Sequence, residues 1–195
     1  MEQLSLFSEK TTNAKSRRHS LRVQTSSART GEGSDDWATP GYVVEAAESF
    51  LGGIGLDPFS DGEDSLVPAK RKITKEENGL VQPWGSENLT PQVWLNPPYS
   101  MMRPVVKKMR QERERTNEFL LLARNAQGTQ WFRNLLPIAT CYGVFDHRIK
   151  FVGASTQAPF DNVLIYGGGD RIEEFRDCWK EYLGFCAMAF WIGKE

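Results

Sequence analysis

Four consecutive residues, Asn96-Pro97-Pro98-Tyr99, have the types and the order needed to hold a planar ring that carries an amino group. Proline fixes its own φ and keeps the residue before it out of the helical region, so Asn96 and Pro97 are expected to be extended. Neither proline has an N–H, so the oxygens here are presented as acceptors, and Tyr99 offers a flat face beside them. A strand followed by a proline-rich turn is the simpler interpretation of the same four residues.

A second candidate site is the acidic turn Asp57-Pro58-Phe59, which follows the apolar run Ile54-Gly55-Leu56. A short apolar strand that ends in an acidic residue and a tight turn is typical of the first strand of a nucleotide-type α/β site. The stretch lacks GxGxxG, and its carboxylate suits a cationic or hydroxyl-bearing ligand better than a pyrophosphate. Taken alone, this stretch is more simply interpreted as an ordinary turn. The downstream Asn-Pro-Pro-Tyr motif is what makes it a candidate binding site.

The elements that must position these residues follow from the apolar pattern. Thr39 and Pro40 predict the start of a helix, with Thr39 as its cap and Pro40 in its first turn. Helices are expected over residues 41–51, 103–116, 129–136 and 173–182, and strands over 54–56, 72–74, 92–95, 118–123, 139–145, 149–152 and 162–166, followed by an apolar tail over 185–192. The strands at 139–145 and 149–152 are expected to form a hairpin. This order predicts an α/β fold of three layers, with a mostly parallel sheet and an antiparallel C-terminal hairpin.

Composition indicates one globular domain after a polar leader. Residues 1–34 are rich in Ser, Thr, Lys and Arg, so we expect a disordered basic tail, with the folded domain over 35–195. The 24 basic and 25 acidic side chains nearly cancel, so net charge excludes no partner. Three cysteines without a CxxC pair and two histidines argue against a zinc site and favour a reduced cytosolic setting. No signal peptide or membrane-spanning run is expected.

At this point the chain resembles a known family. The strings DDWATP, LDPF, NGL, VWLNPPY, LLLAR, WF, RIKF and APFDN occur in the order and with the spacing seen in phage-type, Dam-like DNA N6-adenine methyltransferases. The resemblance covers roughly Asp35 to Gly168. It implies the fold of the S-adenosylmethionine-dependent methyltransferases, double-stranded DNA as substrate, no metal, and a phage or prophage origin with activity in the cytoplasm of a bacterial host, as in restriction-modification. The oligomeric state stays open, with a monomer as one option.

The resemblance also implies roles for individual residues. Asn96, Pro97, Pro98 and Tyr99 would be the catalytic motif: the oxygens of Asn96 and Pro97 would accept the two hydrogens of the adenine amino group, and Tyr99 would stack on the flipped base. The cofactor would be S-adenosylmethionine. Its contacts would come from Trp37, Thr39, Pro40, Asp57, Pro58, Phe59, Glu77, Asn78, Leu80 and Asn96.

Basic residues near the motif are candidates for DNA contact. The helix after Tyr99 carries Lys107, Lys108 and Arg110, which could hold phosphates, although a solvated helix face is the default. Arg124, Arg148 and Lys150 would face DNA or the edge of the pocket. Alternatives are a methyltransferase of the same fold that acts on RNA or on protein glutamine, and a non-catalytic DNA-binding or anti-restriction protein.

Overall fold

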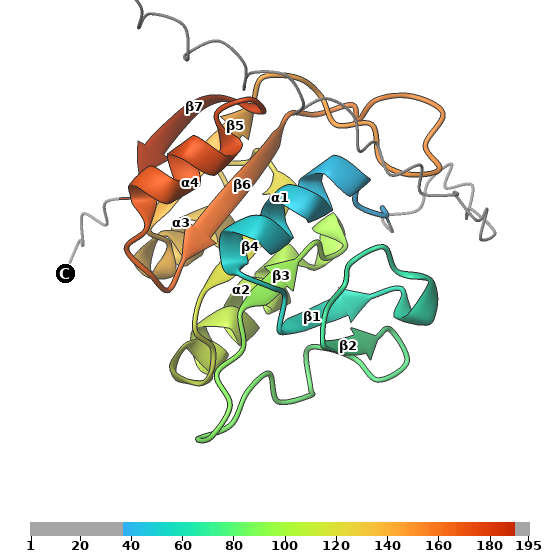
Figure 1. Ribbon diagram of the computed structural model, residues 1–195, viewed down its shortest axis with the longest axis vertical. Coiled ribbons are helices and arrows are strands. Elements are labelled where there is room, and N and C mark those ends of the chain that lie inside the picture. Colours follow the sequence, from blue (N-terminus) through green and yellow to red (C-terminus); the bar gives the residue numbers. More distant parts are fainter. Residues whose placement is uncertain (1–36, 190–195) are drawn as a thin grey trace, which may run out of the picture.

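A seven-stranded mixed sheet forms the middle layer of the protein (Figure 1). The structure, a computed structural model, describes residues 37–189, so the predicted basic tail and residues 190–192 of the apolar tail lie outside the described residues. The strands are β1 (Leu56–Ser60), β2 (Arg71–Thr74), β3 (Val93–Leu95), β4 (Phe119–Arg124), β5 (Cys141–Phe145), β6 (Asn162–Gly167) and β7 (Leu183–Met188). Their order across the sheet is β2-β1-β3-β4-β6-β5-β7.

Helices cover both faces of this sheet. They are α1 (Gly41–Leu51), α2 (Met102–Glu112), α3 (Gln130–Leu135) and α4 (Ile172–Trp179). Successive side chains of a strand point to opposite faces, and β4 follows this rule closely. Leu120 and Leu122 pack in the cluster under α1 and α4, whereas Leu121 and Ala123 pack in the cluster under α2 and α3. Figure 1 shows the first helix pair on one side of the sheet and the second pair on the other, which confirms the predicted three-layer α/β fold.

Across the sheet, the pairing of neighbouring strands changes once from parallel to antiparallel, between β4 and β6. β2, β1, β3 and β4 are parallel neighbours, whereas β6, β5 and β7 join them through antiparallel pairs. The carboxyl ends of β1, β3 and β4 therefore lie at one edge, where antiparallel β6 begins. The loop between β5 and β6 lies at this same edge (orange in Figure 1). Parallel sheets place their ligands at such an edge.

The antiparallel part differs from the predicted hairpin. Residues 149–152 form no strand, and β5 pairs with β6 and β7 instead. The apolar residues behind that prediction, Ile149 and Phe151, are buried as part of an irregular loop. Val152 makes only an isolated antiparallel bridge to Ala38. The apolar composition of 149–152 thus reflects core packing and not strand pairing.

Two local expectations at the start of the domain are also wrong. Helix α1 has Pro40 at its N-cap with no side-chain cap, because the Thr39 hydroxyl accepts a hydrogen bond from Asn96. Strand β1 includes Asp57, Pro58 and Phe59, which were expected to form a turn after it. Its pairing with β2 becomes irregular between Asp57 and Ser60, where proline supplies no N–H.

Within residues 37–189, no helix has the length and apolar character needed to cross a bilayer. The same residues contain no group of three or more His, Cys, Asp or Glu side chains placed to bind a metal ion.

Candidate active site

The amide of Asn96 is fixed in one orientation just beyond β3. Its Nδ2 donates to the carbonyl oxygen of Trp37 at 2.6 Å and to Oγ1 of Thr39 at 3.1 Å. A carbonyl oxygen only accepts, so the atom facing Trp37 must be the amide nitrogen. Oδ1 of Asn96 accepts no hydrogen bond from any residue in 37–189. Asn96 therefore presents an oriented, uncommitted acceptor at the carboxyl edge of the sheet.

The two prolines after Asn96 have different backbone environments. The carbonyl of Pro98 accepts from the N–H of Met101 at 2.9 Å and starts the short 3-10 turn Tyr99–Met101. The carbonyl of Pro97 has no hydrogen bond among the described residues. Pro97 is buried, while Pro98 and Tyr99 are half-buried. The turn thus leaves a second uncommitted acceptor next to Asn96, followed by an aromatic ring.

The segment 37–40 is held against this turn from the other side. The ring of Trp37 packs on Phe151 with centroids 5.6 Å apart, and the N–H of Val152 donates to the Ala38 carbonyl at 3.0 Å. Pro40 is buried at the start of α1. The irregular loop before β6 therefore helps to position the very residues that orient Asn96.

Asp57 is a buried carboxylate at the same edge, one strand away. It is 3% exposed, and β1 and β3 are hydrogen-bonded neighbours with Leu56 opposite Val93. Oδ1 of Asp57 accepts from the N–H of Phe59 at 3.1 Å, while its other oxygen makes no hydrogen bond within residues 37–189. Burial raises the pKa of Asp57 to about 7, the Phe59 hydrogen bond opposes this, and the charge of Asp61 adds to it. Such a group is poised to accept hydrogen bonds from a cationic or hydroxyl-bearing ligand.

The loop after β2 lies directly on this acidic segment. A Cβ on Gly79 would lie 1.9 Å from the carbonyl oxygen of Pro58, so only glycine fits this close approach. Asn78 has φ of +63°, and its Oδ1 accepts from the N–H of Leu80 at 3.1 Å. Glu77 closes the turn by accepting from the N–H of Thr74 at 2.8 Å. The structure thus brings Glu77, Asn78 and Leu80 beside Pro58 and gives the first two a local role in the turn.

Tyr99 is held by residues that come from β6 and from the loop before it. Nδ2 of Asn162 lies 3.1 Å from the Tyr99 hydroxyl, and the Phe160 ring meets the Tyr99 ring edge-on with centroids 5.4 Å apart. The guanidinium of Arg124 lies 5.9 Å from the centre of the Phe160 ring. Asn162 and Phe160 were missed in the sequence analysis. The signal that could have found Asn162 is a polar residue at the start of the apolar run Val163–Tyr166.

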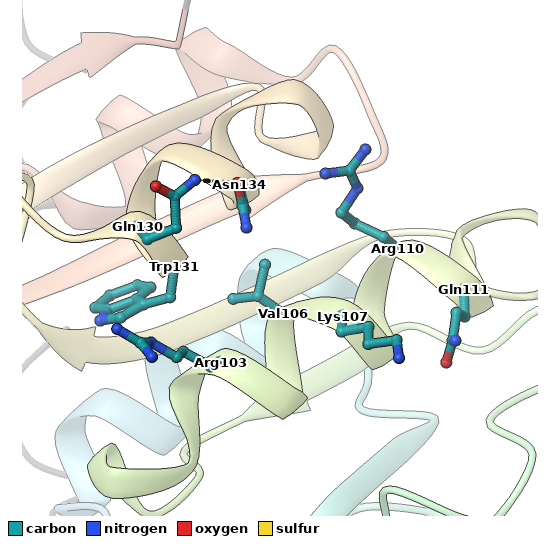
Figure 2. A pocket seen from close by; sticks show the side chains of 8 residues that line it. All are labelled: Arg103, Val106, Lys107, Arg110, Gln111, Gln130, Trp131 and Asn134. Carbon is teal, nitrogen blue, oxygen red and sulfur yellow. Dashed lines mark hydrogen bonds between the residues drawn. The ribbon is translucent and has the colours of Figure 1, made fainter.

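The basic residues of α2 fall into two groups. Lys108 is buried, and its Nζ lies 2.6 Å from Oε1 of Glu112, which also accepts from the backbone N–H of Trp84 through Oε2. Lys108 is therefore not available to a DNA phosphate, contrary to the expectation. Lys107 and Arg110 instead line a groove of about 760 Å³ between α2 and α3 (Figure 2). The groove is lined by Arg103, Val106, Lys107, Arg110, Gln111, Gln130, Trp131 and Asn134.

The loop between β5 and β6 carries the remaining predicted cations. Nε of Arg148 lies 3.4 Å from Oδ1 of Asp161, and both side chains are exposed. Lys150 is exposed as well. An exposed pair of this kind contributes little to stability, so Arg148 can exchange Asp161 for another anion at small cost.

The chemistry of this edge fits S-adenosylmethionine. That molecule carries a cationic sulfonium, an ammonium group and ribose hydroxyls, all of which suit the uncommitted oxygen of Asp57. The close contact between Gly79 and Pro58 brings the 77–80 loop against the acidic strand. The Asn96 turn lies on the adjacent strand, so a methyl donor at Asp57 and a planar acceptor at Tyr99 would be neighbours.

A sheet with a buried acid within one parallel strand and Asn-Pro-Pro-Tyr at the end of the next is typical of the amino-methyltransferases. Comparison with known proteins identifies the family. The family model described as "DNA N-6-adenine-methyltransferase (Dam)" matches residues 26–164, and the chain belongs to this family of adenine-specific DNA methyltransferases. The resemblance seen in the sequence is confirmed.

Two phage proteins are similar to the chain. The DNA N-6-adenine-methyltransferase of Escherichia phage T1 is 33% identical over 98 residues, which are 50% of this chain and 39% of the phage protein. The DNA N-6-adenine-methyltransferase of Haemophilus phage HP1 is 30% identical over 127 residues, which are 63% of this chain and 69% of that protein. The matched part of the chain thus spans well under half of the T1 protein and about two thirds of the HP1 protein.

Proposed function

We propose that this protein transfers a methyl group from S-adenosylmethionine to the N6 amino group of an adenine in DNA, and that Asn96, Pro97 and Tyr99 hold this adenine. The observation that carries the proposal is the Asn96 amide. Its nitrogen is committed to Trp37 and Thr39, which leaves Oδ1 as an oriented acceptor beside the free carbonyl of Pro97. Because its relatives are phage proteins, we place the reaction in the cytoplasm of a bacterial host.

Two acceptors are what this reaction needs. The lone pair of an aromatic amino group is delocalised into the ring, so N6 is a poor nucleophile. When Oδ1 of Asn96 and the carbonyl of Pro97 accept its two hydrogens, N6 is steered toward a tetrahedral shape and its lone pair is directed away from the ring. The same oxygens stabilise the positive charge that develops on N6 as the methyl group arrives. Pro98 helps by keeping Pro97 extended.

S-adenosylmethionine supplies a methyl group activated by its sulfonium. The N6–carbon bond forms as the sulfur–carbon bond breaks, and N6 then releases a proton to water. Asn96 is neutral and does not remove that proton. The contribution of the protein is therefore to position the amino group and to stabilise its charge.

The adenine must leave the duplex to reach this turn. Unstacking and unpairing cost a few kcal/mol, and stacking on an aromatic side chain returns about 1–3 kcal/mol. Tyr99 provides that face.

We assign the contacts with S-adenosylmethionine to Asp57 and to residues near it. The complete set is Trp37, Thr39, Pro40, Asp57, Pro58, Phe59, Glu77, Asn78, Leu80 and Asn96.

DNA phosphates are assigned to exposed cations around this edge. Arg124 ends β4, Arg148 and Lys150 lie in the loop between β5 and β6, and Lys107 and Arg110 lie in the α2–α3 groove together with Arg103 (Figure 2). Arg103, Lys107 and Arg110 are spaced i, i+4 and i+7, so they form one stripe about 10 Å long on α2. One strand of B-DNA presents a phosphate every ~3.4 Å along the axis, so this stripe matches about three phosphates. No acidic residue lines the groove.

The groove assignment is tested by the salt dependence of DNA binding. Lys107→Gln/Arg110→Gln removes two charges and should reduce the slope of log K against log[salt] by about 2. The matched control is Arg176→Gln/Lys180→Gln, which removes two exposed charges from α4 and its end, on the opposite face of the sheet. Equal slopes for the two variants would contradict a phosphate site in the groove.

The main experiment identifies the methylated product. The protein is incubated with labelled S-adenosylmethionine and unmethylated duplex DNA, RNA or protein extract, and the products are digested and separated. Labelled N6-methyladenine in DNA is the expected result. Label found only in RNA or protein would overturn the proposal, and so would binding of DNA without any transfer.

The Asn96→Ala variant tests the mechanism. It removes one of the two acceptors and should lower the rate of transfer at least 100-fold, the cost of losing one transition-state hydrogen-bonding group. Cofactor affinity should fall far less than the rate, because most of the assigned cofactor contacts, Asp57 and its loop included, are untouched. Wild-type turnover of Asn96→Ala would rule out the assigned role of the amide oxygen.

A further inference from the structure

Asn162 is a fully buried polar residue that neither the fold nor the proposed chemistry accounts for. It begins β6 at the site edge, opposite Arg124 of β4. Nδ2 lies 3.1 Å from the Tyr99 hydroxyl. Oδ1 is buried and has no hydrogen-bond partner among the described residues. A tyrosine hydroxyl both donates and accepts, so turning the amide over would leave the nitrogen unpaired instead.

An unpaired buried amide atom is a cost to folding. An apolar residue of similar size at position 162 would not carry that cost. Stability therefore does not explain the asparagine. Its one side-chain hydrogen bond within residues 37–189, to the Tyr99 hydroxyl, does.

The ring of Tyr99 is restrained at two places. Asn162 holds the hydroxyl, and Phe160 packs edge-on against the ring. A six-membered aromatic ring fixed at its tip and at one side has a defined plane. The unpaired amide atom of Asn162 has under 1 Å² of exposed surface, so an incoming base cannot reach it. Asn162 can act on a base only through Tyr99.

We propose that Asn162 is a positioning residue for methyl transfer, which sets the plane of the Tyr99 ring so that a flipped adenine stacks with N6 facing Asn96. This inference rests on the proposed function. It assigns a reason for the tyrosine hydroxyl, which stacking alone does not require. It also makes the first residue of the antiparallel half of the sheet part of a site built mainly on the parallel half.

A double-mutant cycle tests the proposal. Asn162→Leu removes the amide, Tyr99→Phe removes the hydroxyl but keeps the ring, and the third protein carries both changes. Each single variant should lower single-turnover methyl transfer about tenfold, and the double variant should be no slower than either single one, because all three lack the same hydrogen bond. Asn162→Leu should not lower the melting temperature.

The control is Tyr166→Phe, which removes a hydroxyl from the same strand at the opposite edge. It should lower the melting temperature and leave the transfer rate of the folded protein unchanged. If Asn162→Leu does not fold, Asn162→Ser replaces it in the cycle. Two results with an active wild type would overturn this inference alone. In the first, the rate losses of the two single variants multiply in the double variant; in the second, the Asn162 variant keeps full activity. A wild type without transfer to DNA adenine overturns the proposed function instead.

Discussion

Two buried carboxylates at opposite edges of the sheet have opposite environments. Glu118, just before β4, accepts hydrogen bonds from Nε of Arg171 at 3.0 Å and from the Tyr166 hydroxyl at 2.5 Å, and it also pairs with Nη2 of Arg171. Asp57, in β1, accepts one hydrogen bond within the described part of the chain, from the N–H of Phe59. The two residues are 8% and 3% exposed, respectively.

Their pKa values move in opposite directions. Burial raises the pKa of Glu118, but the hydrogen bonds from Arg171 and Tyr166 outweigh it and hold the pKa below its ordinary value of 4.5. Burial raises the pKa of Asp57 from 3.8 to about 7, because the Phe59 hydrogen bond and the charge of Lys72 do not compensate for it. The carboxylate of Glu118 is satisfied by hydrogen bonds from the protein itself, whereas one oxygen of Asp57 has no hydrogen-bond partner within residues 37–189. This asymmetry is what would be expected of a structural edge and a binding edge.

The first prediction concerns stability against pH. The pKa of Asp57 is about 7 in the folded protein and 3.8 unfolded, so the folded state binds the extra proton between these values. The stability of the ligand-free protein should fall as pH rises from 4 to 7, by on the order of 4 kcal/mol from this group. Asp57→Asn keeps the acceptor for Phe59 and removes the charge. Denaturant unfolding at several pH values should therefore show the variant more stable than wild type at pH 8.

The difference in the free energy of unfolding between wild type and Asp57→Asn reports on Asp57 alone, because every other titrating group is the same in both proteins. This difference should fall toward zero as pH approaches 4. If this difference in unfolding free energy did not vary with pH, the pKa of Asp57 would not be raised in the ligand-free protein. The opposite pKa shifts of Asp57 and Glu118 would then be disproved.

The second prediction breaks the satisfied edge. Glu118→Ala leaves the Arg171 guanidinium without its carboxylate and should lower the free energy of unfolding by about 3 kcal/mol. This value is near the lower limit for breaking a buried pair, because Arg171 keeps its contacts with Glu174 and the Phe50 carbonyl. Wild type should lose this stabilisation as pH falls below 4.5, which is the reverse of the Asp57 effect. Unfolding at pH 7 measures the loss. Cofactor affinity of the folded variant should be unchanged, and a loss of that affinity would show that the two edges are coupled.

Much of this arrangement could be predicted from local sequence. The helix over 41–51 matches α1, and the strands other than the one expected over 149–152, with the position of Asn96 just after β3, follow from apolar runs and proline rules. Contacts between distant residues could not be predicted. Thr39 and Asn96 are 57 residues apart, and Asn162 and Tyr99 are 63 apart. No local pattern indicates which donor meets which acceptor over such separations.

Solvated and buried cations also look alike in sequence. Lys107 and Lys108 are neighbours on α2, yet only Lys108 turns inward to Glu112, because the pair at i and i+4 lies on the face that meets Trp84. The segment 149–152 was misassigned for a similar reason. Buried apolar residues in a loop and in a strand have the same composition, and pairing with β6 and β7 had already satisfied β5.

The third prediction tests whether a ligand satisfies the binding edge. A cation or a hydroxyl at Asp57 stabilises the ionised carboxylate, so below pH 7 binding must release its proton. The affinity for S-adenosylmethionine should therefore rise with pH up to about 7 and then level off, by at most about tenfold per pH unit. Asp57→Asn should bind about 30-fold more weakly at pH 8, since hydrogen bonds to charged groups contribute about 2 kcal/mol.

Calorimetric titration with S-adenosylmethionine and with S-adenosylhomocysteine measures this effect. The ligand's own ammonium titrates equally against wild type and Asp57→Asn, so only the difference between the two proteins reports on Asp57. If Asp57 accepts hydrogen bonds from the ribose hydroxyls, the affinities of both ligands should depend on pH. If Asp57 faces the sulfonium, only the affinity of S-adenosylmethionine should show the full pH dependence. Equal, pH-independent affinities for wild type and variant would remove Asp57 from the cofactor site and leave its raised pKa without a function.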